Sequence, residues 1–132
     1  MMITKPDSIL VTEWPTSSTW VGADGILCLI SKKVKPVTLA ETKLYMEEFK
    51  RSLKGKMICM LADMTHLTKS SKAVKEYEAR EIPHCMKAIA LLSGSNFGKL
   101  RAHLSLMFKA PPYPAKVFTS ETKARAWLKK YL

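Results

Sequence analysis

Two short apolar runs, separated by a segment with helical character, constrain the fold of this chain more than any other feature. Residues 57–62 form an unbroken apolar run that ends at Asp63, and residues 87–92 form a second run that is apolar after its first residue. Runs of about six residues are shorter than a typical helix, but they match β-strands that are buried on both faces. The two runs therefore predict neighbouring strands of a parallel sheet that is covered by helices.

A β-hairpin is predicted near the N-terminus. Asp24 and Gly25 stand between two β-forming segments, and this dipeptide favours a tight turn because the turn needs positive φ angles. Besides the two central runs, we expect short strands at residues 9–14, 19–22, 26–31 and 115–118. The hairpin would then form an antiparallel edge of the sheet.

Four helices are predicted between and after the strands. Thr38 and Glu41 have the spacing of a capping box, and Ser70 or Ser71 can cap a second helix that Pro83 stops. The four helices are expected from Thr38 to about Leu53, from Ser70 or Ser71 to about Ile82, over residues 97–108, and from Ser120 to the end. This order predicts one α/β domain over residues 1–132, with a mixed, mostly parallel sheet and residues 1–8 as a flexible terminus.

The cysteines and the hydropathy indicate where the protein resides. Cys28, Cys59 and Cys85 are odd in number and widely separated, which does not fit a disulfide framework. No apolar stretch approaches the roughly 18 residues of a membrane helix, and the N-terminus lacks the apolar core of a signal peptide. We therefore expect a cytoplasmic protein. The spacing of the histidines and cysteines predicts no metal site, and no motif predicts a cofactor.

The chain is strongly basic. It has 22 Lys and Arg against 11 Asp and Glu, a net charge of +11, and between residues 99 and 132 the only acid is Glu121. Such charge attracts polyanions at low salt, so binding of nucleic acid or an anionic surface is one alternative function. A solvated helix face would carry the same charges. The residues predicted for a basic surface are Lys99, Arg101, Lys123, Arg125, Lys129 and Lys130.

The order of the elements and several local phrases resemble the STAS superfamily, and more closely the bacterial SpoIIAA-like proteins. The phrases are the hairpin with Asp24-Gly25, Leu61-Ala62-Asp63-Met64, Tyr77-Glu78-Ala79-Arg80, the strand at residues 87–93, and residues 113–118. The resemblance spans about residues 9–132. It implies a SpoIIAA-like fold and a non-enzymatic regulatory or protein-binding module, with a protein partner.

The resemblance also implies a phosphorylatable serine at the start of the helix that follows the central strand. Ser70 and Ser71 are the nearest counterparts here, although Lys69 stands where an acid is expected and Lys72 replaces a glycine. Phosphate on either serine would lie at the positive end of a helix. Ordinary N-capping explains a serine at this position equally well.

The candidate site lies at the carboxyl end of the central strand, where open α/β sheets bind their ligands. We expect a partner or ligand edge formed by Asp63, Thr65, Ser70, Ser71 and Lys72. Alternatively, Asp63 accepts hydrogen bonds from loop amides such as those of Thr65 or His66. A further alternative function is a small ligand carrier or an enzyme with a pocket near Asp63. The sequence is also compatible with a homo-oligomer.

Overall fold

The computed structural model describes residues 3–66, 70–94, 98 and 112–132. Apart from residue 98, the helix predicted over residues 97–108 lies outside the described residues, as do Lys99 and Arg101. The described part of the chain therefore holds three α-helices, one fewer than the four expected.

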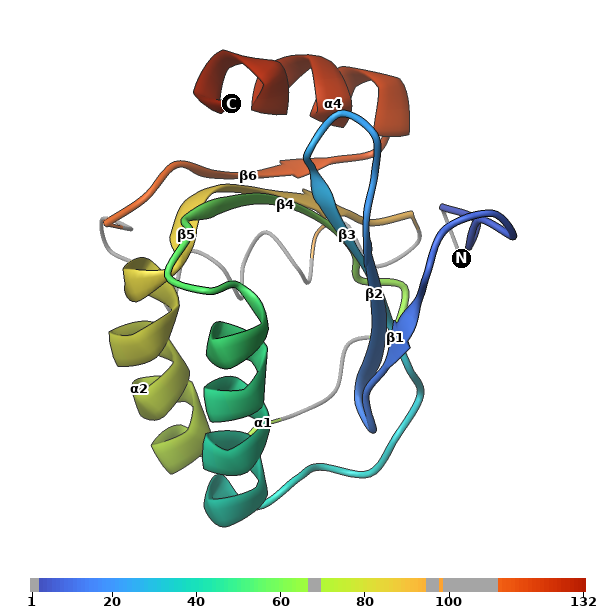
Figure 1. Ribbon diagram of the computed structural model, residues 1–132. Coiled ribbons are helices and arrows are strands. Elements are labelled where there is room, and N and C mark those ends of the chain that lie inside the picture. Colours follow the sequence, from blue (N-terminus) through green and yellow to red (C-terminus); the bar gives the residue numbers. More distant parts are fainter. Residues whose placement is uncertain (1–2, 67–69, 95–97, 99–111) are drawn as a thin grey trace.

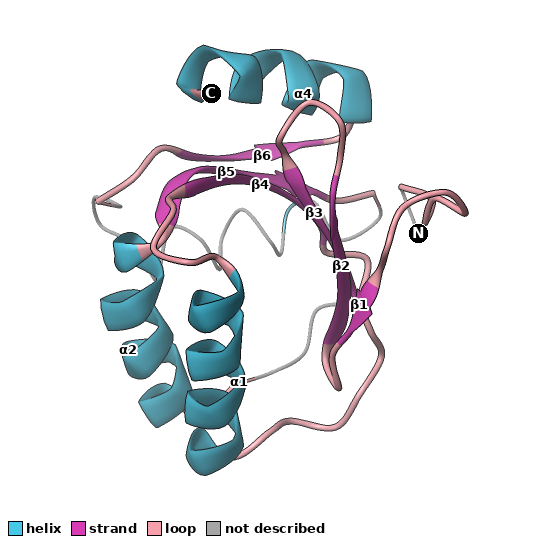
Figure 2. Cartoon of the chain, in the orientation of Figure 1, coloured by secondary structure: helices cyan, strands magenta, loops and turns pink. Residues whose placement is uncertain are grey.

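One six-stranded sheet runs through the molecule, and its strand order follows the chain order (Figures 1 and 2). The pairs β1–β2 and β2–β3 are antiparallel, and the pairs β3–β4, β4–β5 and β5–β6 are parallel. This arrangement confirms the predicted mixed sheet with an N-terminal antiparallel hairpin. The strands are β1 (Thr12–Glu13), β2 (Ser17–Val21), β3 (Leu27–Ser31), β4 (Ile58–Asp63), β5 (Met86–Leu92) and β6 (Ala115–Phe118).

The turn between β2 and β3 forms as its residues predict. Gly25 has a φ of 83°, in the left-handed region that glycine enters without steric cost. The Asp24 Oδ1 atom accepts a hydrogen bond from the Ile26 amide at 3.1 Å, which fixes the turn.

The helices begin at the residues that can cap them. Thr38 caps α1 (Leu39–Ser52) in a complete capping box with Glu41, and Ser71 caps α2 (Lys72–Glu81) by accepting from the Val74 amide. Ser120 caps α4 (Glu121–Leu128), which is followed by a short 3-10 turn, η2 (Lys129–Tyr131). A second 3-10 turn, η1 (Ile82–His84), ends α2 at Pro83.

The helices divide between the two faces of the sheet, with α4 on one face and α1 and α2 side by side on the other (Figure 1). Side chains alternate accordingly along β4. Cys59 and Leu61 pack in a core with Ala124 and Leu128 of α4, whereas Met60 and Ala62 pack in a second core with side chains of α1. A residue's position in this alternation therefore decides which face of the sheet it serves.

Candidate functional site

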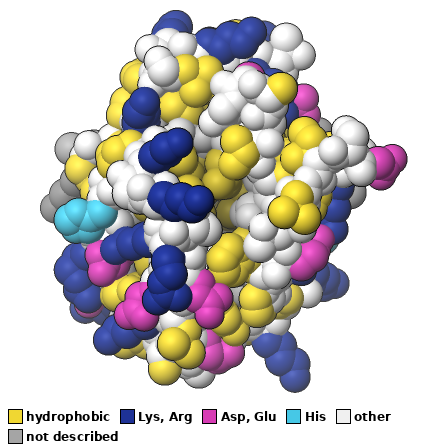
Figure 3. All heavy atoms as spheres, viewed as in Figure 1, with side chains coloured by type: hydrophobic (Ala, Val, Ile, Leu, Met, Phe, Trp, Pro, Cys, Tyr) yellow, Lys and Arg dark blue, Asp and Glu magenta, His cyan; other side chains and the backbone are white. Residues whose placement is uncertain are grey.

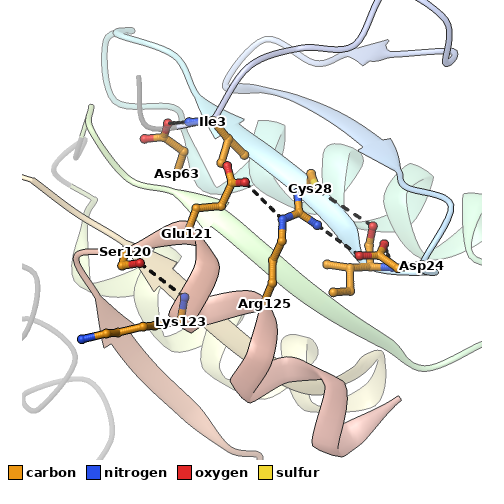
Figure 4. A network of polar contacts seen from close by, with 9 residues as sticks. Ile3, Asp24, Cys28, Asp63, Ser120, Glu121, Lys123 and Arg125 are labelled. Carbon is orange, nitrogen blue, oxygen red and sulfur yellow. Dashed lines mark hydrogen bonds and ion pairs between the residues drawn. The ribbon is translucent and has the colours of Figure 1, made fainter.

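Asp63 ends β4 and is completely buried. Its Oδ2 atom accepts a hydrogen bond from the Ile3 amide at 3.1 Å (Figure 4). Its Oδ1 atom accepts from the Thr65 amide at 3.1 Å and from the Thr65 hydroxyl at 2.5 Å. The carboxylate thus joins the loop after β4 to the N-terminal segment, as the alternative interpretation of Asp63 proposes for Thr65.

The N-terminal segment reaches this carboxylate through Ile3. The sequence predicts a flexible terminus over residues 1–8, and within this segment the structure places the Ile3 side chain in the core beneath α4, 3% exposed. The side chain of Asp63 lies on this same face because it follows Cys59 and Leu61 in the alternation along β4.

The other residues of the predicted edge differ in exposure. Thr65, Ser71 and Lys72 are exposed, and Ser70 is half-buried. Ser71 Oγ accepts from the Val74 amide at 3.2 Å, so this hydroxyl stabilises the first turn of α2. Lys69, which would flank Ser70, lies outside the described residues.

A cavity of about 400 Å³ lies between the sheet and the two helices α1 and α2. Figure 3 shows hydrophobic side chains on both sides of a hollow in this face. Ala62 and Met64 line the cavity, but Asp63 between them does not, because its side chain points to the opposite face. The sequence neighbours of Asp63 therefore line this cavity, whereas the carboxylate of Asp63 lies on the other face of the sheet.

The floor and walls of the cavity are mainly apolar. Met60, Ile89 and Leu91 contribute from the strands, and Phe49 contributes from α1. The polar residues include Ser70 and His66 from the predicted edge region. The predicted edge and the cavity thus meet at Ser70.

Glu78 brings a carboxylate into this apolar lining. It stands four residues after Val74 and four before Ile82, so the three side chains lie on one face of α2, and all three line the cavity. Removal from water raises the pKa of the Glu78 carboxyl above its ordinary value. In the described part of the chain this carboxylate forms neither a hydrogen bond nor an ion pair.

Tyr113 also lines the cavity and is 6% exposed. Burial raises the pKa of its phenol to about 12, with further contributions from Cys85 and Glu78. The phenol is therefore uncharged at neutral pH.

The described residues of the predicted basic surface differ, since Arg125 is held in ion pairs and the lysines are exposed. Arg125 forms an ion pair with Asp24 at 3.1 Å and another with Glu121 at 3.3 Å, and one of its nitrogens lies 3.5 Å from the Cys28 sulfur (Figure 4). Arg125 therefore ties α4 to the turn between β2 and β3. Lys123, Lys129 and Lys130 are exposed at the end of the chain.

Sequence reasoning missed Glu78 as a site residue, although a signal was present. In the sequence, Ala73, Val74 and Tyr77 alone give the second helix a narrow apolar face. Extending the four-residue spacing from Val74 through Glu78 to Ile82 would have placed a carboxylate in an apolar row. The cavity itself has no such signal, because its volume depends on how α1 packs against the sheet.

The three cysteines are free thiols, and all three are buried, where a thiol packs as a small apolar side chain. Burial raises the pKa of each thiol. Within the described ranges, no three His, Cys, Asp or Glu side chains are grouped to hold a metal ion. None of the helices described in the structure has the length and apolar character needed to cross a membrane.

Comparison with known proteins agrees with this architecture. A crystal structure of an uncharacterised protein of the DUF3478 family from Shewanella loihica PV-4, which has a SpoIIAA-like fold, is similar over 92% of each chain. The TM-score is 0.57 and the sequence identity is 15%, so the likeness concerns the fold. No curated protein matches the chain. The family model named Domain of unknown function (DUF7793) matches residues 19–132. This protein, with its SpoIIAA-like fold, therefore belongs to the DUF7793 family.

Proposed function

We propose that this protein is a non-enzymatic binding module that holds a small, mainly apolar ligand between its sheet and the helices α1 and α2. The observation that carries the proposal is the cavity of about 400 Å³ with its apolar lining. Cavities that hold small molecules have volumes of about 300–1,000 Å³, with mostly apolar walls and a few polar groups. This cavity has both properties.

The other face of the sheet supports the assignment by contrast. There the side chains of α4 and the strands form a core in which Ala88, Ala90 and Leu128 are completely buried. On the α1 side, Met46 and Phe49 line the cavity and are only half-buried. The two faces of one sheet are therefore packed differently, and the open face is the one suited to a ligand.

The test fills the cavity and measures binding of a neutral apolar dye, Nile red, by fluorescence titration. Met46→Trp inserts a larger side chain from α1, and Ala62→Leu adds three carbons from the sheet. Leu44→Trp is the matched control, because Leu44 lies on the same helix but is 59% exposed and does not line the cavity.

We expect each filling variant to weaken dye binding about tenfold or more, equivalent to about 1.4 kcal/mol. Leu44→Trp should bind like the unmodified protein. Melting temperatures identify any variant that fails to fold, and the two filling variants act from different elements. Absence of dye binding, or equal binding by both filling variants and the control, would overturn the proposal.

A second candidate function is protein binding at the predicted edge, favoured by the exposure of Thr65, Ser71 and Lys72 beside the cavity residue Ser70. A partner there could respond to occupancy of the cavity. The test is crosslinking of a photoreactive residue placed at Lys72, compared with one placed at the exposed Lys123. Equal crosslinking at both positions would argue against a specific edge.

A further inference from the structure

We propose that the ligand of the cavity is an organic cation, an apolar body that carries a primary ammonium group, and that Glu78 binds this group. The inference rests on the proposed binding function and adds the chemical class of the ligand. It begins from the position of Glu78 in the row between Val74 and Ile82, all of which line the cavity. Burial of a carboxylate in such an apolar row costs free energy unless a group of opposite charge pairs with it.

The acidic neighbours of Glu78 on α2 already have cationic partners. Lys50 binds Glu81 at 3.0 Å, and Lys72 lies 3.9 Å from Glu76. In the described ranges, no Lys, Arg or His lies within ion-pair distance of the Glu78 carboxylate, and this includes the cavity residues Lys35 and His66. Of the three acids of α2, Glu78 is therefore the one without a cationic partner in the described part of the chain.

The aromatic residues of the lining suit the same ligand. Phe49 and Trp14 lie with their ring centroids 6.2 Å apart, and Tyr113 lies close enough to Glu78 for the charge of the carboxylate to raise the pKa of the phenol. All three line the cavity. Aromatic faces attract ammonium groups, and the attraction is strongest where water is excluded. A cavity lined by a carboxylate and by aromatic rings therefore favours a cationic head over an anionic one, and the apolar strands favour an alkyl or aryl body.

The experiment compares three eight-carbon ligands that differ only in the head group: n-octylamine, n-octanol and octanoate. Each displaces Nile red from the protein at pH 7, at concentrations below its aggregation limit. The amine is protonated at this pH, like the side chain of lysine. Two variants accompany the unmodified protein. Glu78→Gln removes the proposed partner, and Glu76→Gln makes the same change of charge at an exposed position of α2.

We expect octylamine to bind about tenfold or more tightly than octanol, because a hydrogen bond between charged groups is worth more than one between neutral groups. Octanoate should bind most weakly. Glu78→Gln should reduce the affinity for octylamine to that for octanol and leave octanol unchanged, whereas Glu76→Gln should preserve the preference for the amine within about twofold.

The outcomes separate this inference from the proposed function. Equal affinity for the amine and the alcohol, or a preference lost equally in both variants, overturns the cationic ligand while cavity binding stands. Displacement of the dye by none of the three ligands also overturns it. If the protein does not bind Nile red at all, the proposed function fails and the cationic ligand fails with it.

Discussion

The substitution Asp63→Ala tests whether this aspartate stabilises the fold. The completely buried carboxylate accepts one hydrogen bond from Ile3 and two from Thr65. Alanine leaves the buried Ile3 amide without this acceptor. An unsatisfied buried donor costs about 1–3 kcal/mol, so we take a loss of stability of about 2 kcal/mol at Ile3. The loop is exposed at Thr65, so water replaces part of what is lost there, and about 1 kcal/mol remains. We therefore expect a loss of about 3 kcal/mol.

The free energy of unfolding is measured by urea denaturation, with hydrogen exchange at the Ile3 amide as a local measurement. Asp63→Asn keeps one carbonyl oxygen for Thr65 and should fall between the alanine variant and the unmodified protein. Asp7→Ala makes the same change of net charge at an exposed position and should lie within about 0.5 kcal/mol of the unmodified protein.

Asp63→Ala should also accelerate hydrogen exchange at Ile3, because the amide loses its acceptor. A loss below about 0.5 kcal/mol together with unchanged exchange at Ile3 would refute the reasoning. Such a result would return Asp63 to the role of a partner-binding carboxylate, which tolerates truncation without loss of stability.

Three further predictions concern stability and reactivity. Glu78→Gln should raise the free energy of unfolding by about 1 kcal/mol at pH 7, because it removes an unpaired charge from the cavity. This gain should vanish as the pH falls through the raised pKa of Glu78, because the protonated carboxyl is uncharged. Urea denaturation at pH 4 and at pH 7 measures the gain, and a gain of equal size at the two pH values would contradict the prediction. Ser71→Ala should cost about 1 kcal/mol in urea denaturation by removing the cap of α2, and Ser71→Asp should restore stability; no loss with alanine would show that the cap is dispensable. Ellman's reagent should modify the three thiols slowly in the folded protein and rapidly in the urea-unfolded protein, because burial protects Cys28, Cys59 and Cys85 and raises the pKa of each. Fast reaction of the folded protein would show that at least one of these thiols is accessible.

Much of the fold could be predicted because local sequence patterns determine its strands and helix starts. The two apolar runs became β4 and β5, and the capping residues Thr38, Ser71 and Ser120 stand at the starts of their helices. Each of these signals depends on residues within a few positions of one another. Such signals survive in a single sequence because the backbone geometry of a strand or a helix end is itself local.

The site was harder to predict because its contacts join distant parts of the chain. The hydrogen bond between Ile3 and Asp63 spans 60 residues, and the ion pair between Asp24 and Arg125 spans 101. On a helical projection Arg125 faces away from the apolar stripe, like the lysines beside it, and only the position of the hairpin turn gives it a partner. The direction of Asp63 follows from the alternation along β4, but knowing which face is open requires the packing of both layers.

The strand order of the sheet has a consequence for how the chain matures on the ribosome. Each strand from β2 to β6 pairs with the strand synthesised before it. A nascent chain can therefore extend its sheet from a finished edge, and none of the six described strands has to be inserted between two strands that were made earlier. Such stepwise growth keeps loop closures short and limits the time for which bare edges are open to aggregation.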